Sequence, residues 1–477
     1  MSRIAAIWGL GRLGGAIGAA IHLHASGYEL KILDRASRAE LEPALSELAS
    51  MGGPEQPELL PEVAGSLDAV DLLVVNQAVH PSHPLLARAR KKGIPCTQEL
   101  DLALDAYPGR VIAVSGTNGK STTASILARA LRTGSDPVLL AGNIGRSLLL
   151  EKKRWRRDQW AVVEVSSAQA ARLDTRRAEL RHLVLTAIGR DHLDWHGSLG
   201  RYHHDKLRLL DAVVPNGSVH GLARCPVFAR LGRGHERLRF RSVSIEPSAE
   251  TPLRLDEAGQ VRWRDRPLFH RDRLGLRGDF NLENAFLAMS LGLELASEPL
   301  ELASRVLTFR GLPHRMQSLG RSQGIEFVDN ASSTVAESSF SALETTSAQG
   351  RVHWVAGGRA KDPCLEDYSL RLAPLAESIH LFGEVAGKLG ARLLRAGARV
   401  RVHDLMSEAL ESAWETAQPG DILLLSPGFA SHDQYLNYRE RAGEALRWWQ
   451  AKIRKETVDS PETRESRGDF FDRSSYA

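Results

Sequence analysis

The segment GTNGKST at residues 116–122 constrains the fold of this chain more than any other feature. It lies between an apolar run that ends at Val114, which is typical of a buried strand, and a helical pattern that starts near Thr123. A strand, a glycine-rich turn and a helix in this order bring successive backbone N–H groups, a lysine and a hydroxyl to one point. Such a turn is typical of loops that bind nucleoside triphosphates.

The loop residues have distinct parts in this interpretation. We expect Lys120 to neutralise β- and γ-phosphate oxygens, Ser121 or Thr122 to ligate Mg²⁺, and the dipole of the following helix to add to the attraction. The first glycine precedes the second by three residues, whereas the usual Walker spacing has five. The predicted nucleotide-binding residues of the loop are Gly116, Thr117, Asn118, Gly119, Lys120, Ser121 and Thr122.

Short apolar runs alternate with helical stretches along three blocks of the chain. This alternation predicts an α/β protein with mostly parallel sheets flanked by helices. We expect a Rossmann-like domain at 1–105, a central P-loop ATPase-like domain at 106–310, a second Rossmann-like domain at 311–455 and a disordered tail at 456–477. A β-hairpin insertion is predicted at 241–274. The predicted strands are 4–8, 29–34, 71–76, 110–114, 160–165, 182–187, 325–329, 352–356, 378–382, 398–402 and 421–426.

Composition excludes several classes of protein. The 477 residues carry 62 lysines and arginines against 58 acidic residues, and this small surplus makes no basic face of the kind that binds nucleic acid. Cys96, Cys225 and Cys364 lack the paired spacing of a zinc site or a disulfide framework, so we expect a reducing, cytoplasmic setting. No apolar run approaches the roughly 18 residues that span a bilayer, which argues against membrane insertion.

A second glycine-rich turn, at 9–14 (GLGRLG), follows the first predicted strand and opens a helix, and Asp34 ends the next strand. This arrangement places a ligand phosphate on the amides of a helix start. Taken alone, it is compatible with a nicotinamide dinucleotide, with a UDP group, or with a tight turn that binds nothing. Gly11, Asp34 and Arg35 are the candidate contacts of this ligand.

Further polar side chains follow the strands next to the phosphate loop. Glu164 ends one strand, His192 and Asp194 follow another, and Lys206 lies on a helix that begins near Leu199. Because ligands bind at the carboxyl edge of parallel sheets, Glu164 is a candidate Mg²⁺ ligand and His192 has a corresponding place at that edge. Read without context, a glutamate at a strand end can also be a surface or capping residue.

Seven short motifs occur in one order along the chain: GTNGKST at 116–122, GNIG at 142–145, EVSSAQ at 164–169, DHLD at 191–194, NLENA at 281–285, LPHR at 312–315 and SPGFASHDQY at 426–435. In this order they resemble the Mur ligases of peptidoglycan synthesis, over about residues 3–450. The last motif and the N-terminal glycine turn are most similar to the branch that adds glutamate to UDP-N-acetylmuramoyl-L-alanine.

The resemblance implies a two-step reaction. The alanine carboxylate of the substrate attacks the γ-phosphate of ATP, and the amino group of glutamate then attacks the resulting acyl phosphate. Lys120 and Mg²⁺ would spread the negative charge while a carboxylate approaches a polyanion. By the family pattern, Ser121 and Glu164 hold one Mg²⁺, and His192 with a carbamylated Lys206 holds a second. The spacing from His192 to Lys206 is slightly shorter here than in the usual members.

The resemblance also assigns the remaining substrate contacts. Asn143 is expected to hold the uridine-linked substrate or its alanine carboxylate, and Asn284 and Arg315 are expected to reach the adenine nucleotide. On their own, Asn143 can be a turn residue and Arg315 an interdomain salt-bridge partner. The residues that match positions binding the incoming glutamate are Thr334, Lys361, Ser431 and Tyr438.

One segment departs from the family pattern. Where many members have Asn-Asp-Ser-Lys-Ala-Thr, this chain has DNASST at 329–334, so the lysine is absent and the acid is displaced. The sequence therefore does not identify which residues contact the ATP ribose and the glutamate. A similar segment, together with LDWHG at 193–197, occurs in relatives that add L-glutamate, so the enantiomer is also open.

Other functions are compatible with parts of the sequence. A folylpolyglutamate-type ligase shares the phosphate loop, but the N-terminal Rossmann block argues against it. A nicotinamide oxidoreductase is favoured only by the first glycine turn, and a catalytically silent homologue only by the altered segment 329–334. For the leading interpretation we expect UDP-N-acetylmuramoyl-L-alanine and glutamate as partners, ATP and Mg²⁺ as cofactors, no nucleic acid, no membrane and a monomer.

Overall fold

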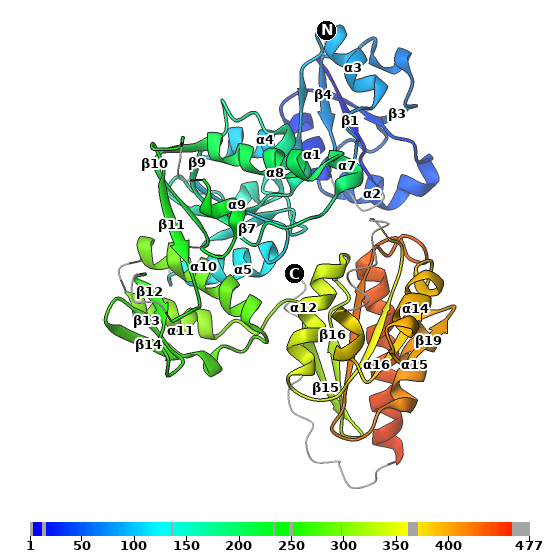
Figure 1. Ribbon diagram of the computed structural model, residues 1–477. Helices are drawn as coiled ribbons and strands as arrows, with labels where there is room; N and C mark the ends of the chain where they lie inside the picture. Colours follow the sequence, from blue (N-terminus) through cyan, green and yellow to red (C-terminus); the bar gives the residue numbers. More distant parts are fainter. Residues whose placement is uncertain are drawn as a thin grey trace. The chain divides into compact units, whose positions relative to one another are not determined.

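A computed structural model describes residues 3–11, 16–134, 137–231, 234–247, 251–296, 298–360 and 371–459. The chain divides into two compact units, and the division falls between Arg310 and Gly311. Unit 1 contains two parallel sheets and a small antiparallel sheet, and unit 2 contains a mixed sheet (Figure 1). The α/β prediction is confirmed. Each predicted strand is present, with ends that differ by no more than two residues.

The first parallel sheet has the strand order β3-β2-β1-β4-β5. β1 pairs with β2 on one side and with β4 on the other, so the chain winds outward from β1 in both directions. Helix α1 packs with α2 and α4, and α3 packs over an apolar cluster that includes Trp8, Leu73 and Leu86. The elements are β1 (Ile4–Trp8), α1 (Ile17–Ala25), β2 (Glu29–Leu33), α2 (Arg38–Ser50), β3 (Glu58–Leu60), β4 (Leu72–Val75), α3 (Pro84–Lys91), β5 (Cys96–Thr97) and α4 (Glu99–Ala106).

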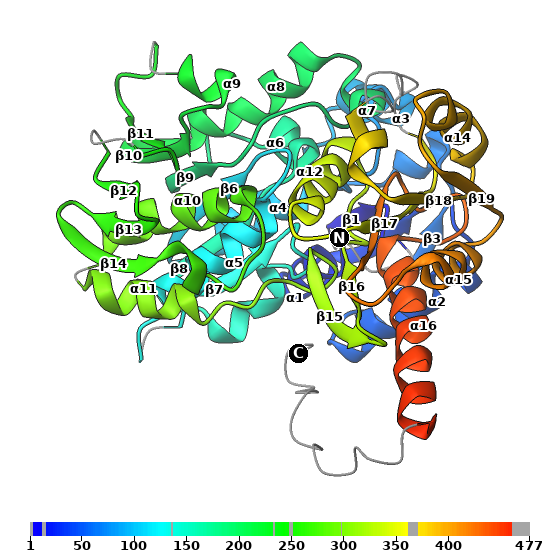
Figure 2. The same cartoon turned by 60° about the horizontal axis from the view of Figure 1, so that its bottom comes forward.

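The second parallel sheet has the order β11-β10-β9-β6-β8-β7. Helices α5 and α10 lie side by side over this sheet (Figure 2). Its strands are β6 (Arg110–Ser115), β7 (Leu139–Gly142), β8 (Trp160–Glu164), β9 (Leu180–Leu185), β10 (Val213–Leu222) and β11 (Arg239–Val243). Its helices are α5 (Lys120–Leu131), α6 (Ser167–Arg172), α7 (Leu193–His196), α8 (Leu199–Leu207), α9 (Pro226–Ala229), α10 (Asp279–Leu295) and α11 (Pro299–Leu307).

The segment 241–274 differs from the predicted hairpin insertion. β11 pairs in parallel with β10 and therefore belongs to the second sheet. β12 (Leu253–Leu255), β13 (Gln260–Trp263) and β14 (Arg266–His270) then form an antiparallel meander. Two tight turns, marked by positive φ angles at Gly259 and Arg264, separate these strands. Polar alternation predicted strands correctly here, but it carries no information on how many turns divide them.

Unit 2 has the strand order β15-β16-β20-β17-β18-β19, in which β15 and β16 are antiparallel and the other neighbours are parallel. Figure 2 shows α15 and α16 on one face of this sheet, where Phe327, Trp414 and Trp449 join one apolar cluster, and α12 and α14 on the other. The elements are α12 (Ala336–Ser347), α14 (Ala386–Arg395), α15 (Met406–Thr416), α16 (Tyr438–Asp459), β15 (Gln317–Ser322), β16 (Ile325–Asp329), β17 (Val352–Gly357), β18 (Ser378–Phe382), β19 (Val400–His403) and β20 (Ile422–Gly428).

Two features of unit 2 were not anticipated from the sequence. β15 enters the sheet through a two-residue turn at Gln323 and Gly324, both with positive φ, as is typical of tight hairpins. Helix α16 extends to Asp459, past residue 456, where the sequence predicts an aperiodic tail to begin. The rest of that predicted tail, 460–477, lies outside the described residues.

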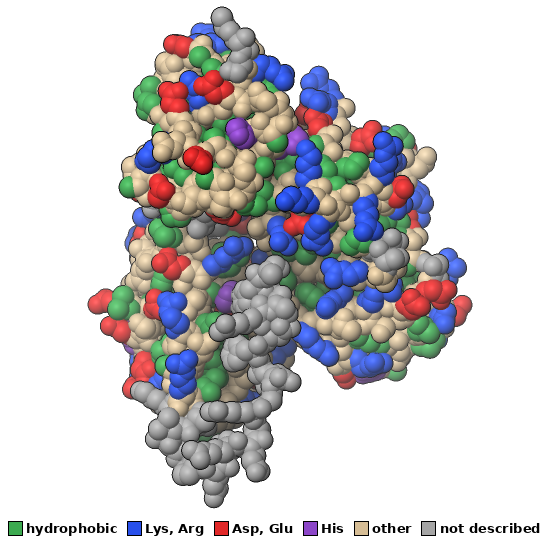
Figure 3. Space-filling view, turned by 180° about the vertical axis from the view of Figure 1, so that it is seen from behind, with side chains coloured by type: hydrophobic (Ala, Val, Ile, Leu, Met, Phe, Trp, Pro, Cys, Tyr) green, Lys and Arg blue, Asp and Glu red, His purple; other side chains and the backbone are tan. Residues whose placement is uncertain are grey.

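On the face in Figure 3, Lys and Arg side chains over the second sheet are interspersed with apolar, polar and acidic side chains. In the described part of the chain, no helix combines the length and apolar character needed to cross a membrane.

A buried polar chain crosses the amino end of the sheet in unit 2. The Nδ1 atom of His353 lies 2.8 Å from Ser378 Oγ, which lies 2.8 Å from His380 Nε2, and Nε2 of His353 lies 3.0 Å from Asp421 Oδ2. The ring of His380 stacks on that of His403 with centroids 5.8 Å apart. His380 is fully buried, and its Nδ1 atom has no hydrogen-bond partner among the described residues.

The pKa of His380 makes the stability of the protein depend on pH. Burial, followed by the neighbouring His403, Arg401 and His353, lowers this pKa to about 3. In the unfolded chain the pKa of this histidine is about 6.5, so between pH 6.5 and pH 3 the unfolded state binds more protons than the folded state. Wild type therefore loses stability as pH falls through this range. From pH 7 to 5 we expect its free energy of unfolding to fall by about 1–2 kcal/mol more than that of His380→Gln.

Urea unfolding at each pH measures this difference. His432 is exposed, and His432→Gln should keep the pH dependence of wild type. Equal losses in wild type and His380→Gln would contradict the assignment.

Candidate functional site

The phosphate loop joins β6 to α5 at the carboxyl edge of the second sheet. The N–H group of Thr117 donates to Ala187 O at 2.7 Å, and its hydroxyl accepts from the N–H group of Gly189 at 2.9 Å. The same hydroxyl lies 2.7 Å from the hydroxyl of Tyr202 on α8. The loop is therefore held by the segment that follows β9 and by α8.

Two glycines of the loop are required by close approach. Helix α5 begins at Lys120, three residues before the predicted start near Thr123, because Gly119 caps it with a left-handed φ of +85°. A Cβ atom on Gly119 would lie 2.2 Å from Oδ1 of Asn284, and one on Gly116 would lie 1.9 Å from Oγ1 of Thr186. The loop backbone is thus packed against α10 and against the end of β9.

The first turn of α5 contains Lys120, Ser121 and Thr122, which the sequence assigned to the loop instead, since this helix begins at Lys120. The Nζ atom of Lys120 donates to Thr117 O at 2.7 Å, so this side chain folds back over the loop. Ser121 and Thr122 are buried in the first turn of α5. Asn284 lies beside them on α10, where its Oδ1 atom accepts from the hydroxyl of Thr123 at 3.3 Å.

Glu164 is the last residue of β8 and is 2% exposed. The amide of Asn143 donates to its Oε1 atom at 3.0 Å. Its Oε2 atom is buried and has no hydrogen-bond partner among the described residues. A buried carboxylate oxygen without a partner is costly, and a bound cation would satisfy it.

Lys206 is 1% exposed and lies on the inner face of α8. Its Nζ atom donates to Gly116 O at 2.8 Å and lies 4.9 Å from the centre of the Tyr202 ring. Burial, followed by the nearby charge of Lys120, lowers the pKa of Lys206 well below its ordinary value, and Asp191 and Glu164 partly oppose this shift. Its amine is therefore more readily uncharged, and more nucleophilic, than that of an exposed lysine.

His192 lies at the same edge but is half exposed. It adopts a positive φ of 50° at the start of α7, and its Nε2 atom lies 3.2 Å from Asp191 Oδ2. Asp194 is exposed. Among the described residues, no three His, Cys, Asp or Glu side chains are grouped as a metal site. A metal ion here would need the hydroxyl of Ser121 or a modified Lys206 in addition to Glu164 and His192.

The predicted contacts of the first sheet lie at its carboxyl edge. The N–H group of Gly11 donates to Oδ2 of Asp34 at 3.2 Å, and Oδ1 accepts from the N–H group of Ala36 at 3.0 Å. Arg35 is exposed, and its Nε atom lies 2.7 Å from Oε2 of Glu62. Asp34 therefore holds both the glycine turn after β1 and the turn that follows β2, and residues 12–14 of the glycine turn lie outside the described residues.

The loop after β4 contains a site residue that the sequence reasoning missed. The amide of Gln77 donates to Asn143 Oδ1 at 3.2 Å, and its Oε1 atom accepts from the hydroxyl of Ser166 at 2.6 Å. Arg172 on α6 donates to the carbonyls of Asn76, at 3.1 Å, and Val79. The edges of the first and second sheets are thus joined. Gln77 directly follows the predicted strand 71–76, and the rule that ligands bind at strand ends could have singled it out.

The other predicted contacts lie in unit 2, apart from Lys361, which lies outside the described residues. Thr334 and Ser431 are on the loops after β16 and β20, and these loops are adjacent because the N–H group of Gly428 donates to Ser333 O at 3.2 Å. Ser431 is buried, whereas Thr334, Arg315 and Tyr438 are partly exposed.

Two side chains of the altered segment 329–334 form hydrogen bonds within unit 2. Asp329 is fully buried, and its Oδ2 atom lies 2.7 Å from Nδ1 of His314. The amide of Asn330 donates to Ser426 Oγ at 3.0 Å and accepts from the N–H group of Met316 at 3.2 Å. Both side chains therefore fix the loop that carries Thr334.

A buried arginine that the sequence did not single out holds the same loops. Arg441 on α16 is fully buried, and its guanidinium donates to the carbonyls of Gly357, Phe429, Ala331 and Ser333 at 3.1–3.4 Å. One side chain thus ties together the loops that follow β16, β17 and β20.

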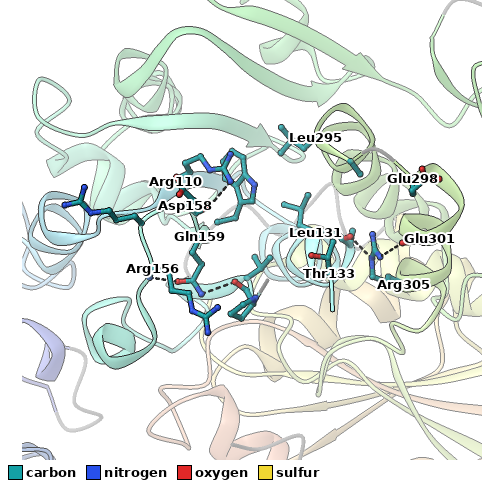
Figure 4. A pocket seen from close by; sticks show the side chains of 16 residues that line it. Arg110, Leu131, Thr133, Arg156, Asp158, Gln159, Leu295, Glu298, Glu301 and Arg305 are labelled. Carbon is teal, nitrogen blue, oxygen red and sulfur yellow. Dashed lines mark hydrogen bonds and ion pairs between the residues drawn. The ribbon is translucent and has the colours of Figure 1, made fainter. Parts of the chain in front are cut away.

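A cavity of about 500 Å³ lies at the opposite edge of the second sheet (Figure 4). It is lined by the first residues of β6 and β8, Arg110 and Trp160, and by Arg305 of α11, which pairs with Glu301 at 3.4 Å. Because it opens at the amino ends of the strands, it is separate from the phosphate loop.

Comparisons with known proteins agree with this geometry. The chain matches the Mur ligase middle domain over residues 114–292 and the Mur ligase glutamate ligase domain over residues 314–429. It is 32% identical to UDP-N-acetylmuramoylalanine--D-glutamate ligase of Aquifex aeolicus (strain VF5), over 91% of this chain and 95% of that protein. The chain belongs to the Mur ligase family. A protein of the same name from Rubrobacter xylanophilus is 33% identical, over 81% of this Mur ligase and 85% of that protein.

Solved structures show the same fold as this Mur ligase. The crystal structure of UDP-N-acetylmuramate-alanine ligase MurC from Thermotoga maritima aligns with a TM-score of 0.61 at 15% identity, over 94% of this chain and 99% of that one. MurF ligase of the same organism, in complex with ADP, aligns with a TM-score of 0.57 at 15% identity, over 95% and 96% of the two chains.

Gly119 provides a test of the nucleotide site. In Gly119→Ala, the left-handed backbone and the clash with Asn284 should together displace the loop and weaken the binding of ADP by at least about tenfold. Gly27 is the matched control, because its φ is +83° and a Cβ atom there meets nothing within 4 Å. Gly27→Ala should lose some stability to the same backbone strain and bind ADP like wild type. Calorimetric titration with ADP measures both, and equal affinities in Gly119→Ala and Gly27→Ala would contradict the assignment.

Proposed function

We propose that this Mur ligase joins D-glutamate to UDP-N-acetylmuramoyl-L-alanine at the expense of ATP, a step of peptidoglycan precursor synthesis. The relatives that are 28–33% identical over most of the chain carry that name, and it specifies D-glutamate. The observation that carries the proposal is the cluster of phosphate loop, Glu164 and Lys206 at one sheet edge, because ATP-dependent activation of a carboxylate needs these groups together.

In this reaction a negatively charged carboxylate must approach the negatively charged phosphates of ATP. An oxygen of the alanine carboxylate attacks the γ-phosphorus of ATP, the bond to the bridging oxygen breaks and ADP leaves. The amino group of glutamate then attacks the acyl carbon, loses a proton, and displaces inorganic phosphate that retains one carboxylate oxygen. Lys120 and the start of α5 stabilise the charge that develops on the transferred phosphoryl group.

The residues present fit Mg²⁺. Ser121 and Glu164 would hold one ion, since Glu164 Oε2 is buried without a partner among the described residues. His192 and Lys206 would hold a second after the uncharged Lys206 amine takes up carbon dioxide, forming a carbamate and releasing one proton. When bound, Mg²⁺ supplies charge neutralisation and orientation of the phosphate oxygens.

The remaining substrate contacts are assigned to different parts of the chain. The UDP-linked substrate is bound by Gly11, Asp34, Arg35 and Asn143. The side chain of Asn143 is held in place by the amide of Gln77, which donates to its Oδ1 atom at 3.2 Å. Asn284 and Arg315 bind the adenine nucleotide. Thr334, Lys361, Ser431 and Tyr438 bind glutamate. The three domain ranges predicted above, a monomeric state and a cytoplasmic location belong to this proposal.

Phosphate release with ATP, Mg²⁺ and UDP-N-acetylmuramoyl-L-alanine tests the proposal directly. With D-glutamate we expect turnover, and with L-glutamate a rate at least about tenfold lower, since a mismatched stereocentre loses part of the transition-state binding. Lys120→Ala should lower kcat by at least about 100-fold, because Lys120 contacts the phosphate that carries the developing charge.

Each other outcome contradicts a stated part of the proposal. Turnover with L-glutamate alone would overturn the enantiomer. Silence with both, despite measurable ATP binding, would overturn glutamate as the substrate and favour another amino acid, another acceptor or a silent homologue.

A further inference from the structure

A buried hydrogen-bond chain joins helices α6 and α8 beside the phosphate loop. The side chain of His196 is fully buried, its Nδ1 atom lies 2.8 Å from Asp205 Oδ2, and its Nε2 atom lies 3.0 Å from Ser167 Oγ. Because a carboxylate can only accept, Nδ1 donates to Asp205, and Nε2 then accepts from the hydroxyl of Ser167. A neutral histidine satisfies both neighbours at once, because one ring nitrogen donates and the other accepts.

Each end of this chain is next to a residue of the proposed magnesium sites. Asp205 directly precedes Lys206 on α8, and Ser167 follows Glu164 by three residues and begins α6. Asp205 is also held by Arg201, whose Nε atom lies 2.9 Å from its Oδ1 atom. Through His196, the helix that carries Lys206 is therefore tied to the segment that follows Glu164.

Helix α8 presents its inner residues along one face. Tyr202, Asp205 and Lys206 have the spacing i, i+3, i+4 that places side chains together on a helix. Tyr202 lies 2.7 Å from the hydroxyl of Thr117, and Lys206 donates to Gly116 O at 2.8 Å. One helix face thus contacts the phosphate loop at two points and reaches the Glu164 segment through Asp205 and His196.

We propose that His196 is a positioning residue that sets the placement of Lys206 relative to Glu164, and thereby the Mg²⁺-dependent binding of the nucleotide. The proposal rests on the function proposed above. Serine, histidine and aspartate in this order also resemble a hydrolytic triad, but Ser167 is 5% exposed and its hydroxyl is closed to a substrate. His196 therefore acts through its neighbours, in the manner of residues that orient metal ligands without touching the metal.

A cavity of about 700 Å³ lies beside helices α7 and α8. Its lining includes His196, Asp205, Trp195, Gly197 and Arg201. The His196 imidazole itself has no exposed surface, so the cavity borders this residue at its backbone. Free imidazole carries the same donor and acceptor as the lost side chain and can be used to probe the vacated space in His196→Ala.

His196→Ala and a matched control, His220→Ala, test the proposal. The His220 side chain is 1% exposed in the second sheet, and its ring nitrogens lie 2.8 Å from Ser290 Oγ and 3.1 Å from Ser218 Oγ, so its removal measures the general cost of losing a buried histidine. In His196→Ala we expect the Mg²⁺ concentration for half-maximal binding of a non-hydrolysable ATP analogue to rise about 10- to 100-fold, with a similar loss in kcat and an unchanged KM for glutamate. Added imidazole should recover part of both losses in His196→Ala and nothing in His220→Ala.

Ser167→Ala provides a second variant with little change in volume. It breaks the same chain at its other end and should shift the Mg²⁺ dependence in the same direction as His196→Ala, even if His196→Ala does not fold. An unchanged Mg²⁺ dependence in Ser167→Ala, or equal shifts in His196→Ala and His220→Ala, would overturn the proposal. If wild type binds the analogue but turns over neither enantiomer of glutamate, the proposed function fails, and the binding comparison still decides the role of His196.

Discussion

The pairing register of β6, β8 and β9 is the constraint on which the rest of the site depends. Val114 lies opposite Glu164 on one side and opposite Val184 on the other, so the three strands end at the same level. The phosphate loop, Glu164 and the turn that contains Thr186 therefore leave the sheet side by side. A shift of β8 by one residue would turn the Glu164 carboxylate to the other face of the sheet and away from Asn143.

This edge gathers buried polar groups that are costly to the fold by themselves. Glu164 has a carboxylate oxygen without a partner among the described residues, and Lys206 is buried close enough to Lys120 for its pKa to fall. Such groups lower the free energy of unfolding, yet in a site that excludes water they act on phosphate and carboxylate charges more strongly than they would in solvent. These residues therefore lower the stability of the fold and strengthen the electrostatic interactions of the site with a charged substrate.

The sequence predicted the parts of the site that are encoded locally. The strand before the loop, the glycines at 116 and 119 and the place of Glu164 at a strand end each follow from a short pattern, and the structure has all three. The start of α5 was misplaced because the left-handed cap at Gly119 depends on its fit against Asn284, which is far away in the chain.

Contacts between distant segments were beyond sequence reasoning for the same physical reason. Gln77 meets Asn143 and Ser166 only after the first and second sheets are assembled. Arg441 belongs to a helix whose pattern gives no sign that a guanidinium is buried among three loops. The chain from Ser167 to Asp205 likewise needs α6 and α8 to be packed together, and no sequence pattern singled out its histidine.

In the proposed reaction, the carboxylate of the substrate is activated by transfer of the γ-phosphoryl group of ATP. Synthesis of UDP-N-acetylmuramoyl-L-alanine with ¹⁸O in the alanine carboxylate, followed by mass analysis of the phosphate released with D-glutamate, measures this transfer. We expect one ¹⁸O atom from each activated carboxylate to appear in inorganic phosphate. Phosphate without ¹⁸O, formed together with the amide product, would contradict it.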